Sequence, residues 1–278
     1  MWQIIGFEKN KSFFEKAVTD QSLNHAYLFS GPEMIGKRTF ALELAHQLGE
    51  NSDIIYLDPA DSESGKTISI AEIRKIKNFM SFSPFASKYK FAIINDAHLM
   101  TEEAQNALLK ILEEPNSSSL LILITASPSL LLPTVVSRCQ EINFLPHSKQ
   151  IIADILKNSK IPSAGNELLL ELTAGKIGLI FDILKNNSFD KLKKSIEQLA
   201  DLAKADIEER FAFALKISDD KNRLDLEKKI LYWILYARTR LEEPKIRRIL
   251  KELLVLNKTI VKPQYNLRLA LENFLIQI

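Results

Sequence analysis

The stretch HAYLFSGPEMIGKRTFALEL, residues 25–44, carries the most informative pattern in this chain. An apolar run over 26–30 leads into a glycine-containing turn, and a helical pattern begins at Lys37. This order of strand, turn and helix surrounds an anion with backbone N–H groups and a helix N-terminus, and the lysine can reach terminal phosphates. The stretch therefore predicts a phosphate-binding loop whose nucleotide-binding residues include Gly31, Gly36 and Lys37. The alternative is an ordinary turn that ends in a surface lysine.

The residue after the lysine departs from the pattern of such a loop. Arg38 stands where the loop normally carries Ser or Thr, whose hydroxyl holds the Mg²⁺ that neutralises charge during phosphoryl transfer. A guanidinium cannot ligate a cation and adds a like charge. Thr39 is kept as a candidate for the nucleotide site, but one helical residue turns its side chain by about 100°, so it does not easily replace the hydroxyl. We expect no metal site here.

A second acidic motif lies in KFAIINDAHLM, residues 90–100. ATPases with this kind of loop carry two adjacent acids at the end of such a strand, one for Mg²⁺ and one for the attacking water. This chain has Asn95, a poor partner for magnesium, followed by Asp96, which is kept as a degenerate nucleotide-site candidate. The alternative is that both residues only end the strand and cap the next turn. Two altered metal positions together predict that the chain does not hydrolyse nucleotide.

The first half of the chain alternates apolar runs with helical patterns. The runs, which suit strands buried on both faces of a parallel sheet, are 26–30, 53–58, 90–96 and 120–126. Residues 101–115 carry an apolar helical face, acidic side chains in the first turn and a proline at the end. Alternation of this kind predicts an α/β domain.

Beyond about residue 145 only helical periodicity remains. We therefore divide the chain into an α/β nucleotide-fold domain over 1–145, a small helical lid over 146–188 and a helical domain over 189–278. The predicted fold class is α/β followed by all-α.

Composition narrows the function further. The 278 residues carry a net charge of +2, which gives no signature of polyanion binding, so any contact with nucleic acid is expected to be local or shared with partners. A single cysteine, Cys139, excludes an internal disulfide and a Cys₂ or Cys₄ metal site. The most apolar stretch, 120–136, is interrupted by prolines and serines and is too short to span a membrane. With no secretory signal visible, we expect a reducing, cytoplasmic location and no membrane partner.

These segments together resemble the clamp-loader branch of the AAA+ proteins. The resemblance rests on HAYLFSGPEMIGKRT (25–39), FAIINDAHLMTEEAQNALLKILEEP (91–115), LPTVVSRCQEINF (132–144) and YNLRLALENFL (265–275). It covers nearly the whole chain. It implies an AAA+ P-loop NTPase-like parallel sheet domain, a small helical lid and a C-terminal helical collar that joins several subunits in a ring.

The resemblance also implies partners and a role. The ring of a clamp loader opens the sliding clamp and places it on primed DNA, so the implied partners are gamma/tau-like and delta-like loader subunits, the sliding clamp and, through the assembled complex, primed DNA. The branch that this chain resembles most shares the fold of the motor subunits but usually does not hydrolyse ATP. Gly178 stands where motor subunits carry a γ-phosphate-sensing arginine, and Thr125 or Ala126 stands at the sensor position after a strand. No cofactor is required, although ATP or ADP could be held passively.

Arg138, in the segment Ser137–Cys139, matches the motif through which such subunits are thought to reach a neighbour's nucleotide. A guanidinium presented in trans meets a γ-phosphate with a planar, permanently charged fork. The resemblance therefore implies a catalytic role in trans for Arg138. The alternative is a local salt bridge at a helix end.

Two other functions stay open. One is a motor ATPase of the gamma/tau type with atypical metal ligands, because Lys37 and Asp96 remain. The other is a free-standing nucleic-acid-binding module, which the near-zero net charge disfavours.

Overall fold

The computed structural model describes residues 2–61, 67–157, 161–217, 223–260 and 266–278. The chain divides into two compact units, the first formed by Met1–Ile151 with Gly175–Gly178 and the second by Ile152–Ala174 with Leu179–Ile278. The division into three domains predicted from the sequence stays a prediction, because this partition does not separate a lid from the last helices.

The elements of the first unit alternate along the chain as the sequence predicts. In order they are α1 (Glu8–Thr19), β1 (Ala26–Ser30), α2 (Lys37–Leu48), β2 (Ile54–Leu57), α3 (Ile70–Ser81), β3 (Lys90–Ile94), α4 (Glu102–Glu113), β4 (Ser119–Thr125), α5 (Pro133–Val136) and β5 (Gln140–Asn143). Four strands were predicted within two residues of their bounds at each end. β5 was not predicted, because its side chains alternate between half-buried and exposed and carry little apolar signal.

The strands form one parallel sheet in the order β2-β3-β4-β1-β5. Their carboxyl ends therefore meet at one edge, which is where ligands bind in open α/β sheets. Ser30 pairs in register with Thr125, and Leu57 with Ile94, so the loop after β1, the turn after β3 and the end of β4 all leave the same edge. The α/β fold class is confirmed.

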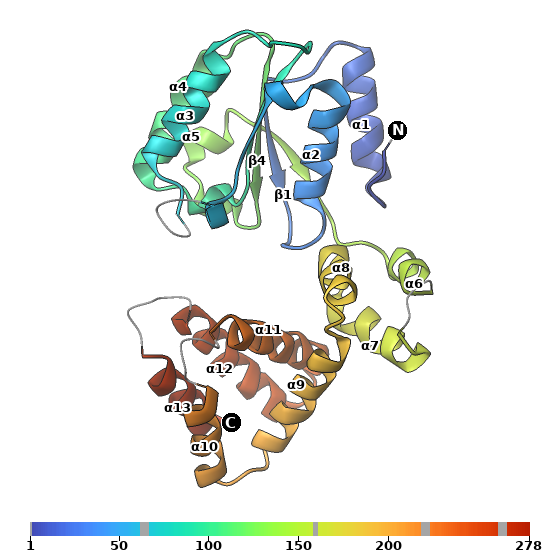
Figure 1. Ribbon diagram of the computed structural model, residues 1–278, viewed down its shortest axis with the longest axis vertical. Helices are drawn as coiled ribbons and strands as arrows, with labels where there is room; N and C mark the ends of the chain where they lie inside the picture. The colour runs from blue at the N-terminus through green and yellow to red at the C-terminus, as the bar shows by residue number, and fades with distance from the viewer. Residues whose placement is uncertain (1, 62–66, 158–160, 218–222, 261–265) are drawn as a thin grey trace. The chain divides into compact units, whose positions relative to one another are not determined.

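Helices cover both faces of the sheet, with α1 and α2 on one face and α3, α4 and α5 on the other (Figure 1). Successive side chains of β1 point to opposite faces of the sheet. Ala26 and Leu28 belong to the core beneath α3 and α4, whereas Tyr27 and Phe29 belong to the core beneath α1 and α2. Burial on both faces explains why the strand reads as one continuous apolar run.

The second unit is helical. Its elements are α6 (Lys149–Lys157), α7 (Ser163–Thr173), α8 (Ile177–Lys185), α9 (Phe189–Leu202), α10 (Ile207–Ile217), α11 (Arg223–Thr239), α12 (Pro244–Ile260) and α13 (Leu267–Gln277), the first residues of α6 and α8 being counted with the first unit. Trp233 of α11 lies at the centre of this core and donates a hydrogen bond from Nε1 to the Ser195 carbonyl oxygen at 2.6 Å. Tyr265, the first residue of the collar-like ending predicted from the sequence, lies outside the described residues.

Within the described part of the chain, no helix combines the length and the apolar character needed to cross a bilayer.

Candidate functional site

The loop between β1 and α2, which the sequence predicts to bind phosphate, holds two glycines in conformations with positive φ. Gly31 and Gly36 have φ of 140° and 108°, in the region that favours glycine. A Cβ atom on Gly31 would collide with the Phe144 carbonyl oxygen, so only glycine lets the loop pass this close to the chain after β5. Gly36 is the residue that precedes the first turn of α2. The backbone conformation at both predicted positions therefore favours glycine over other residues.

Lys37 is turned onto the loop itself. Its side chain is buried, and Nζ donates to the carbonyl oxygens of Gly31 and Pro32, both at 2.6 Å. Burial lowers the pKa of Lys37 to about 8, although the nearby charges of Asp96 and Glu33 oppose this shift. The amine that would meet a phosphate thus stabilises the loop's own carbonyl groups.

Arg38 pairs with an acid that the sequence analysis did not single out. Its Nη1 lies 3.2 Å from Oδ2 of Asp58, and its guanidinium lies 4.7 Å from the ring centroid of Tyr56. Burial alone would raise the pKa of Asp58, but hydrogen bonds from Tyr56 and the Ala60 amide, together with the Arg38 charge, hold it below its ordinary value. The Arg38 guanidinium is therefore the cation that compensates this carboxylate.

The pair Asn95 and Asp96 is joined to the same network. Asn95 Nδ2 donates to Asp58 Oδ2 at 3.3 Å and to Asp96 Oδ2 at 3.1 Å. Asp96 has a φ of 43°, an uncommon conformation that aspartate tolerates, and burial raises the pKa of its carboxyl group. One amide group thus donates to two carboxylates at the end of the sheet.

These residues do not fit a magnesium ion. Mg²⁺ needs an octahedral set of oxygen ligands with negative charge to bind it. Here the Asp58 carboxylate already receives the Arg38 guanidinium and the Asn95 amide, and an N–H donor lies between the two acids. Among the residues that the structure describes, no cluster of three or more His, Cys, Asp or Glu side chains is arranged to hold a metal ion.

Two threonines among the candidates differ in burial and in hydrogen bonding. Thr125 is buried at the end of β4, and its Oγ1 lies 3.2 Å from Nδ1 of His98 and accepts from the Ser127 amide at 3.0 Å. Of the two residues proposed for the sensor position, Thr125 therefore offers a positioned hydroxyl, whereas Ala126 has none. Thr39 is exposed on α2, and its hydroxyl forms no hydrogen bond within the described part of the chain.

Gly178 packs directly on the phosphate-binding loop. Its amide donates to the Met34 carbonyl oxygen at 2.6 Å, from the first turn of α8. A Cβ atom at this position would lie 2.6 Å from the same oxygen, closer than real Cβ atoms approach. The missing side chain therefore allows a backbone contact between Gly178, which belongs to the first unit, and the loop, which the sequence alone did not reveal.

Arg138 follows α5 and forms local contacts in this chain. Nη1 donates to the Thr134 carbonyl oxygen at 3.0 Å, and Nη2 lies 3.0 Å from Oε1 of Glu113 at the end of α4. Both side chains of this ion pair are well exposed, 38% for Arg138 and 50% for Glu113. The neighbouring Cys139 has its pKa raised to about 12 by burial, so its thiol stays protonated and unreactive.

Three residues of this site went unnoticed in the sequence. Asp58 and Tyr56 belong to the run over 53–58, whose ending in an acid was the available signal. Met34 contributes only its backbone carbonyl oxygen, so its residue type could not indicate the contact.

Comparisons with known proteins agree with the resemblance. A family model described as "DNA polymerase III, delta subunit" matches residues 47–148. Subunit delta' of DNA polymerase III from Bacillus subtilis is 29% identical over 204 residues, which cover 66% of this chain and 60% of that relative. Subunit tau from the same organism is 32% identical over 171 residues, which cover 54% of this chain and 30% of tau. The chain thus spans less than two thirds of the length of these curated relatives.

A solved structure extends the similarity in fold to nearly the whole chain. The crystal structure of a DNA polymerase III gamma-subunit-related protein from Thermotoga maritima matches with a TM-score of 0.59 and 24% identity, over 95% of this chain and 97% of that one. At this identity the match shows the fold alone. The matches to the family model and to delta' confirm the predicted resemblance to delta-prime-like subunits of clamp loaders.

Proposed function

We propose that this chain, which is similar to subunits delta' and tau of DNA polymerase III, is a clamp-loader subunit that does not hydrolyse ATP itself. In this proposal it scaffolds the loader ring and lends Arg138 to the nucleotide of a neighbouring motor subunit during sliding-clamp loading.

The observation that carries the first part is the ion pair between Arg38 and Asp58. The guanidinium follows Lys37 at the start of α2, where the metal-binding hydroxyl of an active loop would stand, and it compensates the nearest strand-end carboxylate. Phosphoryl transfer relies on a metal ion to neutralise developing charge. A fixed guanidinium held by a protein carboxylate does not replace that ion. ATP or ADP, if bound here, would be held passively.

The second part rests on how weakly Arg138 is held. Its partner Glu113 is half-exposed, and exposed ion pairs contribute about 0–1 kcal/mol. Little free energy therefore opposes the exchange of this carboxylate for a phosphate of another subunit. A phosphate accepts two parallel hydrogen bonds from a guanidinium fork, and arginine fingers in other NTPases contribute on the order of 10³–10⁵ in rate.

The partners follow from the same assignment. They are gamma/tau-like and delta-like loader subunits, the sliding clamp, and primed DNA reached through the assembled complex. The last helices of the second unit would form the collar. On α12 and α13 they leave Val255, Leu269 and Ile276 at least half exposed, as a surface between subunits would require.

A catalytically active motor ATPase is the second candidate. Lys37 and Asp96 remain in place, and the match to tau is as close as the match to delta'. The ion pair of Arg38 with Asp58, at the position of the metal-binding hydroxyl, speaks against this candidate.

Reconstitution of the loader tests the role of Arg138. The loader would be assembled from gamma/tau-like and delta-like subunits with this chain, and DNA-dependent ATP hydrolysis and clamp loading would be measured. We expect Arg138→Ala to lower hydrolysis at the adjacent motor site by on the order of 10³ and to impair loading. Arg138→Lys should rescue little, because an ammonium lacks the planar fork.

Glu113→Ala is the matched control, because it removes the local partner and leaves the guanidinium. If Arg138 acts in trans, Glu113→Ala keeps full activity. If Arg138→Ala leaves loading intact, or if both variants lose the same activity, the arginine has only its local role.

A further inference from the structure

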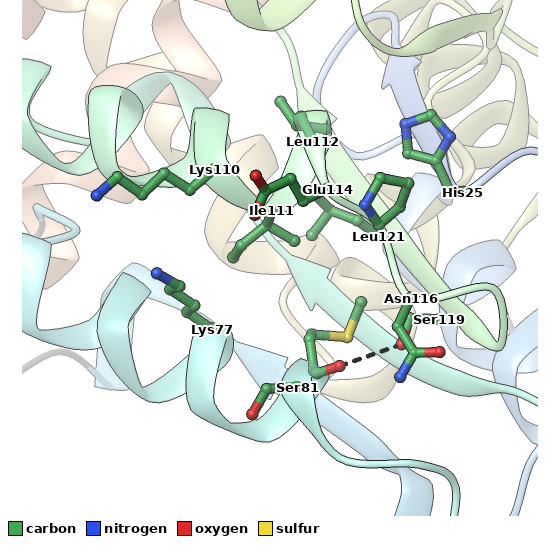
Figure 2. Close-up of a pocket in the computed structure, with 12 residues that line it drawn as sticks. His25, Lys77, Ser81, Lys110, Ile111, Leu112, Glu114, Asn116, Ser119 and Leu121 are labelled. Atoms are coloured by element: carbon green, nitrogen blue, oxygen red, sulfur yellow. Dashed lines mark hydrogen bonds between the residues drawn. The ribbon is translucent and has the colours of Figure 1, made fainter.

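A pocket lies at the opposite edge of the sheet from the phosphate-binding loop. It is lined by His25, just before β1, by Ser119 at the start of β4, and by the ends of α3 and α4 (Figure 2). Because all strands are parallel, this is the amino edge of the sheet, so the pocket is separate from the candidate nucleotide site. Its volume of about 320 Å³ lies at the small end of the range for small-molecule sites, which is about 300–1,000 Å³.

The floor of the pocket is apolar. Met80, Ile111, Leu112 and Leu121 line it, and each is at most 9% exposed. These side chains come from α3, α4 and β4, which belong to one packed core. A floor built on the core is preformed, so a ligand that covers it would lose little free energy to reorganisation.

Charged groups stand on one side of this floor. Lys77 of α3 and Lys110 of α4 extend toward the same side of the pocket, away from His25 (Figure 2). Both are exposed, and neither forms an ion pair within the described residues. Glu114 is the one acidic side chain among the described lining residues, so two ammonium groups outnumber one carboxylate.

An unsatisfied polar atom stands on the other side. Nε2 of His25 is buried and has no hydrogen-bond partner among the residues that the structure describes. A buried polar atom without a partner costs about 1–3 kcal/mol. A ligand atom that can form a hydrogen bond there would recover this free energy.

We propose that this pocket binds an elongated organic anion with an apolar middle and oxygen atoms at both ends, the class of dicarboxylates and hydroxy acids. One carboxylate meets the ammonium groups of Lys77 and Lys110. The apolar middle covers Met80, Ile111 and Leu121, and the oxygen at the other end meets His25 Nε2. This site is independent of the function proposed above, because it uses none of the residues of the phosphate-binding loop or of Arg138.

The test uses the full chain labelled with ¹⁵N and titrated with suberate, a linear dicarboxylate. Imidazole resonances of His25 report on Nε2, and we expect them to shift and saturate. Octanoate, which lacks the second oxygen-bearing end, should bind more weakly, and octanol, which lacks the charge, more weakly still. The double variant Lys77→Met, Lys110→Met should weaken suberate binding by about tenfold or more, since hydrogen bonds to charged groups contribute about 1.5–3 kcal/mol.

Lys75→Met is the matched control, because this exposed lysine of α3 does not line the pocket, and it should bind suberate as the wild-type chain does. The proposal fails if His25 shows no saturable shift. It fails equally if octanol binds as tightly as suberate, or if the double variant binds suberate unchanged.

Discussion

Arg38 Nη1 lies 3.2 Å from Asp58 Oδ2, and this contact joins the first turn of α2 to the end of β2. The guanidinium also stacks on Tyr56, and Asn95 donates to the same carboxylate. A cation supplied by the chain therefore balances the acid beside the phosphate-binding loop. The loop keeps its two glycines in positive-φ conformations, and the Asp58 carboxylate beside it is paired with Arg38.

Arg38→Met removes this cation and keeps most of the side-chain volume. Asp58 is nearly buried and loses one compensating charge, while Arg38 itself is 56% exposed, so solvent screens part of the effect. We expect the free energy of unfolding, measured with urea, to fall by about 1 kcal/mol. Arg74→Met, at an exposed position of α3, is the control and should leave it unchanged. A midpoint for Arg38→Met equal to that of the wild-type chain would show that the pair contributes nothing to stability.

Lys37→Met should change how stability depends on alkaline pH. The pKa of Lys37 is about 8 in the folded chain and about 10.4 in an unfolded chain, so the unfolded state binds more protons between these values. This lysine therefore makes stability rise as pH increases across that interval, by up to about 3 kcal/mol. The difference between wild type and Lys37→Met, from urea unfolding at several pH values, should show that rise. The control Lys16→Met replaces an exposed lysine of α1 and should keep the pH dependence of the wild-type chain. Equal pH profiles for wild type and Lys37→Met would refute the lowered pKa of Lys37.

Asp53→Asn should flatten the acid dependence of stability. Asp53 is fully buried, and its carboxylate accepts hydrogen bonds from the backbone amides of Phe85, Ala86 and Ser87 at 2.6, 2.9 and 3.0 Å. These hydrogen bonds lower the pKa of Asp53, and the bond from the Phe85 amide has the largest effect. Its stabilisation is thus present above the unfolded pKa of about 3.9 and is lost as pH falls through the lower folded value.

Urea midpoints between neutral pH and strong acid check this prediction. The asparagine variant should be less stable at neutral pH and lose less stability on acidification than wild type. Asp20→Asn, at an exposed position, should follow the wild-type profile. A variant as acid-sensitive as wild type would mean that other carboxylates dominate.

Gly178→Ala tests the contact between Gly178 and the Met34 carbonyl group of the loop. The new Cβ would lie 2.6 Å from the Met34 carbonyl oxygen, a backbone atom that cannot rotate away. Overpacking of this kind costs about 1–3 kcal/mol, and we expect the free energy of unfolding to fall by that amount. Lys185→Ala, in the last turn of the same helix, should have no effect. A stable Gly178→Ala chain would show that the loop adjusts freely.

The sheet could be predicted because its strands carry the signal locally. The run over 26–30 is apolar at every position but the last, since β1 is buried on both faces, and residues 101–115 carry their own start and stop signals. β5 escaped prediction because Gln140–Asn143 lies at the edge of the sheet and has two exposed side chains.

The chemistry of the site was predicted only in part. Gly31, Gly36 and Lys37 lie within one local motif and were found from it. The pairing of Arg38 with Asp58 depends on which strands are neighbours, and the contact of Gly178 with the loop depends on how distant segments pack. Neither is encoded in the spacing of residue types.

Steady-state release of phosphate from ATP by the purified full chain, with and without Mg²⁺, decides whether the candidate nucleotide site at the loop between β1 and α2 hydrolyses ATP. We expect no more phosphate from the wild-type chain than from Lys37→Met under either condition. Release that requires Mg²⁺ and disappears in Lys37→Met would contradict it.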